Sequence, residues 1–184
     1  MRVLTVGNLY PPQHLGGYER MWQAAVAGLR ARGHDVRVLT TDTRLHDAAA
    51  GDEPGVERSL RWYWREHRFP YMGPMAVRAL ERHNRAVLER AAEDADVVSW
   101  WSMGGMSLRL IGVPRAPALS VVHDDWLVYG PRVDRSVQRR RRRLPPREAL
   151  GHGLFVSQHT LDRARAAGWA PVTAEVAHSG YDER

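Results

Sequence analysis

Short apolar runs alternate with longer amphipathic stretches along the whole chain. The runs are typical of buried strands, and the amphipathic stretches repeat apolar residues at helical spacing. The runs predict strands at 2–7, 35–41, 96–101, 118–123, 153–157 and 172–178. The helical patterns predict helices at 17–32, 74–94 and 159–167. This alternation predicts an α/β fold: one Rossmann-like domain over residues 1–184, a doubly wound parallel sheet with helices on both faces.

The first strand–helix–strand repeat has the clearest pattern. Gly33 follows helix 17–32 where a helix stop is expected, and strand 35–41 then completes a β-α-β unit. The apolar face of this helix consists of Met21, Trp22, Ala25, Val26 and Leu29.

Two stretches after this unit are less regular. Residues 42–56 are polar and predict a loop. Residues 56–64 fit a strand that carries Trp62 and Trp64 on one side and Tyr63 on the other, but the pattern leaves this assignment open.

The composition limits the classes of protein to which this chain can belong. Apolar residues make up 43% of the 184 residues, which is typical of a globular domain rather than a disordered chain. There is no cysteine, so disulfides and thiolate metal sites are excluded. No run approaches the apolar length of a membrane span, and the first residues form a strand pattern rather than a signal peptide. We therefore expect a cytoplasmic protein, with a peripheral membrane location as the alternative.

The net charge is +6, and all 27 basic residues are arginine. This charge favours anionic partners in general. The densest basic stretch is Arg139–Arg143. It fits a solvated helix face, and it also fits contact with a phosphorylated acceptor or with an anionic membrane surface. Nucleic acid is disfavoured, because no nucleic-acid-binding motif accompanies the charge.

Gly16 and Gly17 stand between the first strand and the first helix. Without a Cβ, the backbone can approach a ligand closely, and the N–H groups at a helix start suit a phosphate. The alternative is a tight turn with no ligand. Neither a dinucleotide-binding fingerprint nor a P-loop is present, because no G-x-G-x-x-G and no Gly-Lys-Ser/Thr occurs here.

Two further segments lie at the carboxyl ends of predicted strands. One contains Trp100, Trp101 and Ser102 before a pair of glycines, and the other is His123, Asp124, Asp125 and Trp126. Ligands of doubly wound sheets bind at the carboxyl ends of the strands. We therefore expect these segments and the Gly16–Gly17 turn to meet along one rim.

The segment with His123 allows more than one interpretation. Asp124 and Asp125 can hold the tautomer of His123 and raise its pKa, or they can bind sugar hydroxyls themselves. The alternative is a structural histidine. No other residue supplies ligands at a recognised metal-site spacing, so we expect no metal.

The tryptophans at this rim also allow two interpretations. The rings of Trp100, Trp101 and Trp126 can stack on a sugar, or they can pack beneath a loop. Trp22 lies on the apolar face of the first helix and is expected in the core.

Several segments together resemble the N-terminal half of family-four glycosyltransferases, a group of retaining enzymes with the GT-B fold. The resemblance covers nearly the whole chain. It rests on 2–6, Tyr10-Pro11-Pro12, Gly16-Gly17-Tyr18-Glu19-Arg20, 29–40, Val121-Val122-His123-Asp124, Phe155-Val156-Ser157 and 176–182. The last motif reads Ser-Gly-Tyr-Asp at 179–182, where the family usually has Asn-Gly-Val-Asp.

The resemblance implies an acceptor-binding domain of an enzyme that moves a sugar from a nucleoside diphosphate sugar to a hydroxyl. It places the N–H of Gly17 near the distal phosphate of the donor, His123 near the transferred sugar, and Glu19 at the acceptor pocket. It implies no metal and no other cofactor. It also implies a second Rossmann-like domain, absent from this chain, that holds most of the nucleotide sugar.

Two other functions stay open at this point. One is a non-catalytic sugar- or anion-binding module with the same fold, and the other is a basic nucleic-acid-binding protein. If the chain is a transferase domain, we expect loops 42–56, 62–75 and 126–147 to set its specificity.

Overall fold

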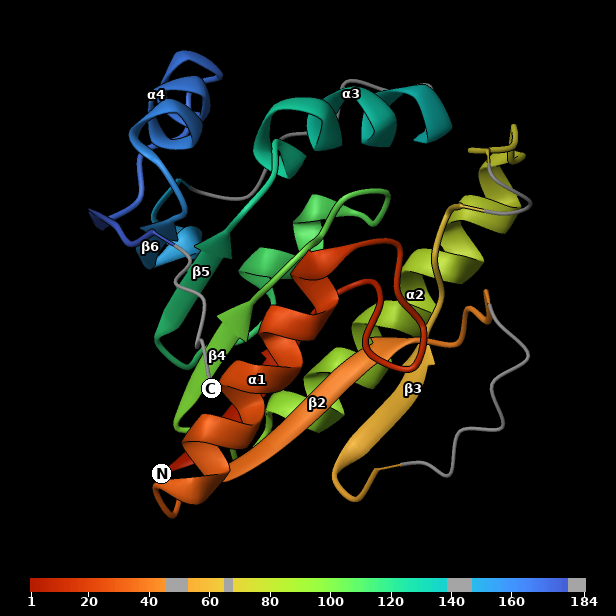
Figure 1. The fold of residues 1–184 in the computed structure, drawn as a ribbon. Coiled ribbons are helices and arrows are strands. Elements are labelled where there is room, and N and C mark those ends of the chain that lie inside the picture. Colours follow the sequence, from red (N-terminus) through yellow and green to blue (C-terminus); the bar gives the residue numbers. More distant parts are fainter. Residues whose placement is uncertain (46–52, 65–67, 139–146, 179–184) are drawn as a thin grey trace.

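The computed structural model describes residues 1–45, 53–64, 68–138 and 147–178. Their strands form one all-parallel sheet in the order β3-β2-β1-β4-β5-β6-β7 (Figure 1). The predicted Rossmann-like doubly wound fold is therefore confirmed, in a form consistent with one half of a GT-B fold. The strands are β1 (Arg2–Val6), β2 (Asp35–Thr41), β3 (Val56–Leu60), β4 (Val97–Trp100), β5 (Ala118–Val122), β6 (His152–Phe155) and β7 (Thr173–Val176).

The strand order reverses between β1 and β4. From β1 the chain moves outward through β2 to β3, and from β4 it moves the other way through β5 to β7. The helices are α1 (Gly17–Ala31), α2 (Pro74–Ala92), α3 (Trp126–Gln138) and α4 (Gln158–Ala166), with 3₁₀ turns η1 (Leu108–Gly112) and η2 (Arg147–Leu150).

Alternating residues of the strands bury against different helices. Val3, on β1, belongs to the core formed with α1, whereas its neighbour Leu4 belongs to the larger core on the opposite face. That larger core includes apolar residues of α2, α3 and α4. The described helices thus cover both faces, as predicted, but unequally, with α1 alone on one side (Figure 1).

Aromatic packing fixes α1 against the sheet. Trp22 is fully buried, as its place on the apolar face of the helix predicts. Its ring stacks on Trp101 at 5.8 Å between centroids and meets Tyr10 edge-on at 5.0 Å. Contacts of this kind stabilise beyond the buried area alone. They set the position of the first turn of α1 relative to the ends of β1 and β4.

Residues 126–138 differ from the prediction. We expected part of a loop there, but the chain forms α3 with Pro131 inside the helix. Proline removes one backbone donor and normally disfavours a helix interior. Trp126 and Leu127 at the start of α3 are both buried in the larger core. This burial anchors the helix despite the proline.

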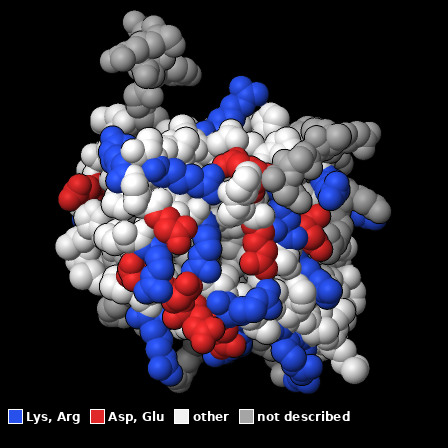
Figure 2. All heavy atoms as spheres, turned by 90° about the horizontal axis from the view of Figure 1, so that it is seen from below, with Lys and Arg blue, Asp and Glu red and all other residues white. Residues whose placement is uncertain are grey.

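The amino ends of the strands carry a mixed charge pattern. Figure 2 shows basic and acidic side chains interspersed on this face. The guanidinium of Arg2 lies 2.9 Å from the carboxylate of Asp96, and Arg37 pairs with Asp94. These partners lower the pKa of both aspartates through hydrogen bonds to their charged forms. The excess of arginine therefore does not produce a uniformly basic surface on this face.

Gly151 and Gly33 provide a matched test of how tightly β6 packs. Both have positive φ, at 63° and 80°, but a Cβ on Gly151 would lie 1.8 Å from the carbonyl oxygen of Ala118, whereas one on Gly33 meets no atom within 4 Å. We predict that Gly33→Ala lowers the free energy of unfolding by about 1 kcal/mol and Gly151→Ala by at least about 3 kcal/mol. Urea denaturation measures both; equal losses would contradict the packing of β5 against β6.

Candidate functional site

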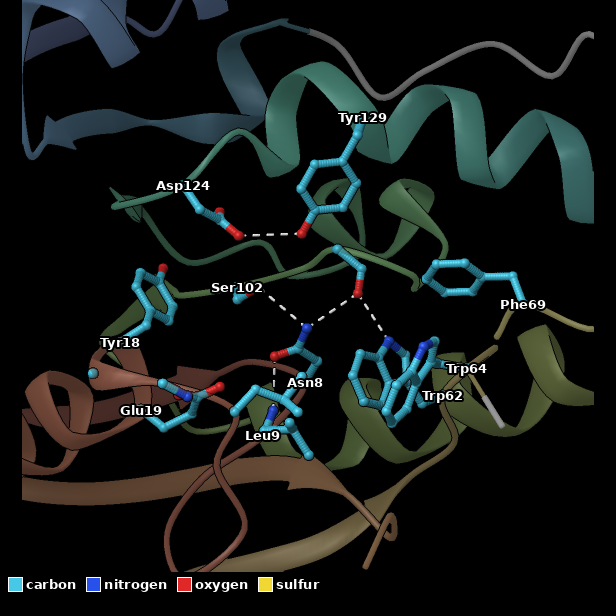
Figure 3. A pocket seen from close by; sticks show the side chains of 14 residues that line it. Asn8, Leu9, Tyr18, Glu19, Trp62, Trp64, Phe69, Ser102, Asp124 and Tyr129 are labelled. Carbon is cyan, nitrogen blue, oxygen red and sulfur yellow. Dashed lines mark hydrogen bonds between the residues drawn. The ribbon is translucent and has the colours of Figure 1, made fainter. Parts of the chain in front are cut away.

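A pocket of about 440 Å³ opens at the carboxyl ends of β1 and β4, where the strand order reverses. Loops that leave a doubly wound sheet in opposite directions form a crevice at this point, and ligands of such folds bind there. The pocket is shown in Figure 3. Its lining residues are Asn8, Leu9, Leu15, Gly16, Gly17, Tyr18, Glu19, Trp62, Trp64, Phe69, Ser102, Gly104, Asp124 and Tyr129.

Asn8 joins the two loops beneath the pocket. Its side-chain Nδ2 donates to Ser102 Oγ at 3.2 Å and to the carbonyl oxygen of Gly104 at 3.1 Å. Its Oδ1 accepts from the N–H of Leu9 at 2.8 Å (Figure 3). The backbone N–H of Asn8 also donates to Ser102, at 2.8 Å. Because Asn8 is buried, these bonds replace water and tie the loop after β1 to the loop after β4.

One wall of the pocket is aromatic. The ring centroids of Trp62 and Trp64 lie 4.9 Å apart. The buried Trp62 donates its indole N–H to the carbonyl oxygen of Gly104 at 2.8 Å. Phe69 is 40% exposed beside them. The region 62–75, predicted to set specificity, contributes these rings. The open strand assignment for 56–64 is confirmed only at Val56–Leu60, so Trp62 and Trp64 lie beyond the end of β3.

The opposite wall is polar. Tyr129 donates its hydroxyl to Asp124 Oδ2 at 3.2 Å, and the N–H of Trp126 donates to Asp124 Oδ1 at 3.2 Å. The Asp124 carboxylate stays accessible from the pocket, and partial desolvation by the surrounding protein raises its pKa above the ordinary value. Burial and the charge of Asp124 raise the pKa of Tyr129, so its hydroxyl is a hydrogen-bond donor at neutral pH.

Gly104 allows the two walls to approach. A Cβ at Gly104 would lie 2.0 Å from the hydroxyl oxygen of Tyr129. Its carbonyl oxygen meanwhile accepts from Asn8 and from Trp62. A single residue without a side chain therefore contacts the base and both walls of the pocket.

The paired glycines begin α1 at the edge of the pocket. Gly16 and Gly17 are exposed, and added Cβ atoms would meet nothing within 4 Å. The N–H of Gly16 donates to the carboxylate of Glu19 at 3.2 Å. Glu19 is buried and caps the helix as well as lining the pocket. The next N–H groups of α1 have no partner within the helix, and they carry its partial positive charge.

His123 lies beside this pocket, outside its lining. Its half-buried ring meets Tyr18 edge-on at 5.0 Å and lies 6.2 Å from the ring of Trp101. It lines a neighbouring groove between α1 and the sheet, with Met21 among the lining residues. Tyr18 lines the pocket and therefore stands between the pocket and the imidazole.

One of the two open interpretations of the carboxylates is wrong. Burial lowers the pKa of the His123 imidazole, so Asp124 and Asp125 do not raise it. Asp125 points elsewhere, because its carboxylate pairs with Arg163 of α4 at 2.9 Å. Asp124 is held by Tyr129. The imidazole is therefore favoured in its neutral form.

The structure supports the packing interpretation for the three predicted rim tryptophans. Trp100 and Trp126 are fully buried in the larger core, and Trp101 is buried against Trp22. None of them lines the pocket. Trp100 at the end of β4 and Trp126 at the start of α3 point into the core. Ser102 and Asp124, two residues away from them, line the pocket instead.

Some lining residues were not singled out from the sequence. Asn8 directly follows the first predicted strand, and a polar residue at that position is a sequence signal that could have indicated a site. Tyr129 gives no such signal, because only the turn of α3 brings it to Asp124. Arg139–Arg143 and the 179–182 motif lie outside the described residues, as do residues 46–52 of the predicted loop 42–56.

The fold and this crevice define a Rossmann-like α/β domain with a pocket at its topological switch point. The family model for Glycosyltransferase Family 4 matches residues 15–184, and the chain belongs to this family. A comparison with curated proteins found no match. Within the described residues, no helix has both the length and the apolar character to cross a membrane.

We predict that Asn8→Asp lowers the free energy of unfolding by about 3 kcal/mol, because it replaces two buried N–H donors with a carboxylate oxygen that faces the carbonyl of Gly104. Ser102→Ala removes only one partner of Asn8 and should cost about 1 kcal/mol. Chemical denaturation compares the variants. Equal losses would show that Asn8 does not hold the two loops together.

The pH dependence of stability tests the environment of His123. The folded state lowers the pKa of this imidazole, so below about pH 6.5 the unfolded chain binds the proton more readily and stability falls. We predict that the melting temperature drops more between pH 7.5 and pH 5.5 in the wild type than in His123→Gln. The variant controls for the other histidines. Equal drops in both proteins would contradict a buried, neutral imidazole.

Proposed function

We propose that this domain binds the acceptor of a retaining glycosyltransferase, which moves a sugar from a nucleoside diphosphate sugar to a hydroxyl. The observation that carries the proposal is the character of the pocket at the switch point. It combines an aromatic wall, which suits a sugar ring, with the oxygen atoms of Asp124 and Tyr129, which suit hydroxyls. Its described lining contains no arginine, so it is poorly suited to a diphosphate.

The proposed reaction places the acceptor hydroxyl beside Asp124. The carboxylate accepts a hydrogen bond from that hydroxyl and orients its oxygen. A new bond forms between this oxygen and the anomeric carbon, and the bond from that carbon to the diphosphate breaks. The hydroxyl proton leaves with the released nucleoside diphosphate.

The donor is held mainly elsewhere in this proposal. The first N–H groups of α1, beginning at Gly17, supply partial positive charge at the pocket edge for the distal phosphate. A second Rossmann-like domain holds the rest of the nucleotide sugar, and closure of the two domains excludes water. We propose that no metal takes part, since helix N–H groups and basic groups stabilise the leaving diphosphate.

We further propose that His123 lies near the transferred sugar. Three features support this role: it follows β5 at the carboxyl edge, its imidazole is favoured in the neutral form, and its ring touches Tyr18 of the pocket wall. A neutral imidazole can accept a hydrogen bond from, or donate one to, a sugar hydroxyl.

We predict that the 184-residue chain binds simple glycosides at millimolar strength, binds nucleoside diphosphates at least about tenfold more weakly, and transfers no sugar, because the donor's diphosphate lacks side-chain partners in the described pocket. Isothermal titration calorimetry with phenyl β-D-glucopyranoside and with uridine and guanosine diphosphates measures the first two quantities. Mass spectrometry of reactions with the corresponding glucose donors measures the third.

Gly17→Pro provides the control, because it removes one N–H donor at a position where proline is compatible with a helix start. It should weaken any residual diphosphate binding more than it weakens glycoside binding. Tight diphosphate binding or sugar transfer by this chain alone would contradict the proposed division of substrates between two domains.

A further inference from the structure

The charge of the pocket is opposite to the charge of the chain. The protein carries a net charge of +6, yet the described lining of the pocket contains two carboxylates, Glu19 and Asp124, and neither lysine nor arginine. Basic residues gather elsewhere, for example Arg78, Arg82 and Arg109 around a separate hollow between α2 and η1.

Neighbouring arginines are engaged with other groups. Arg58 donates to the carbonyl oxygens of Tyr10 and Pro11 at 3.0 and 2.5 Å. Arg163 pairs with Asp125, and neither residue lines the pocket. The described lining itself therefore offers carboxylates, and no basic side chain, to an anionic group in the pocket.

The two walls have complementary chemistry. In Figure 3, Asp124 and Glu19 lie on one side of the pocket, and Trp62, Trp64 and Phe69 lie on the other. Tryptophan faces stack on flat or ring-shaped apolar surfaces. A carboxylate accepts hydrogen bonds from hydroxyls and repels phosphate and carboxylate groups. A molecule that satisfies both walls has a ring and hydroxyls, and it carries no negative charge.

We propose that the acceptor is an uncharged compound that contains a ring and hydroxyl groups, and that Asp124 excludes phosphorylated and carboxylated analogues. This inference rests on the proposed function and names its acceptor class. The ring lies against Trp64, and a hydroxyl donates to the carboxylate that Tyr129 holds in place. The general attraction of the chain for anions, which its arginines suggest, does not extend to this site.

The test compares phenyl β-D-glucopyranoside with its 6-phosphate, two ligands that differ only in charged substituent. Nuclear magnetic resonance titrations follow the indole N–H signals, which Trp62→Phe and Trp64→Phe variants assign. At low salt, we expect the neutral glycoside to bind at least about tenfold more tightly than its 6-phosphate, because the phosphate and the carboxylates of the pocket repel each other at close range. We also expect the difference to shrink as salt rises.

Asp124→Asn supplies the decisive variant. Its amide can keep both contacts, because its oxygen can accept from the N–H of Trp126 while its NH2 donates to the hydroxyl of Tyr129. The charge is gone, so the 6-phosphate should bind at least about threefold more tightly than it does to the wild type. Affinity for the neutral glycoside should fall, because a hydrogen bond to a neutral amide oxygen is weaker than one to a carboxylate, so the preference for the neutral ligand should narrow from both sides. Asp162→Asn removes an exposed carboxylate on α4, where it accepts from Gln158, and should leave the discrimination unchanged.

The outcomes separate the two proposals. If the 6-phosphate binds to the pocket as tightly as the neutral glycoside, the inference about charge is overturned while the acceptor site stands. The same follows if Asp124→Asn and Asp162→Asn have equal effects. If neither ligand shifts the signals of Trp62 and Trp64, the pocket is not an acceptor site, and both proposals fail.

Discussion

The pocket depends on the hydrogen bonds that the side chain of Asn8 makes across the gap between two diverging loops. β1 and β4 pair side by side, but their following segments run to opposite halves of the sheet. Divergent loops tend to leave backbone groups without partners. Asn8 satisfies groups from both loops at once, because one amide carries two donors and an acceptor. The site therefore has a rigid base on which its walls can be placed.

The walls are close to each other because Gly104 has no side chain. Tyr129 occupies the space that a Cβ would take, and Trp62 donates to the same residue's carbonyl oxygen. The aromatic and polar walls thus come from segments far apart in the sequence, yet both are positioned by one loop after β4. This arrangement connects the topology of the sheet to the chemistry proposed for the pocket.

Much of the fold follows from the sequence. The alternation of apolar runs and amphipathic stretches predicts the parallel sheet and the positions of α1, α2 and α4, because burial on two faces of a sheet leaves that pattern directly in the chain. The sequence did not predict α3, in which Pro131 disfavours the helix and burial of Trp126 and Leu127 outweighs that effect. This burial is a tertiary contact, so it leaves no local signal in the sequence.

The site was predictable only in part. Strand ends and glycine pairs indicated the edge of the sheet at which this pocket lies, and Gly16, Gly17, Glu19 and Asp124 line it. Side-chain direction was not predictable: Trp100 and Trp126 turn into the core, while Trp62 and Trp64 turn to the pocket. The pKa of His123 depends on burial, which its neighbours Asp124 and Asp125 in the sequence do not reveal.

The most direct test of the proposed acceptor pocket is the crystal structure of the chain soaked with phenyl β-D-glucopyranoside. We predict electron density for the ligand above Asn8, with a ring on Trp64 and a hydroxyl within hydrogen-bond distance of Asp124. Density in the neighbouring groove beside His123, with the pocket between these two walls left empty, would contradict it.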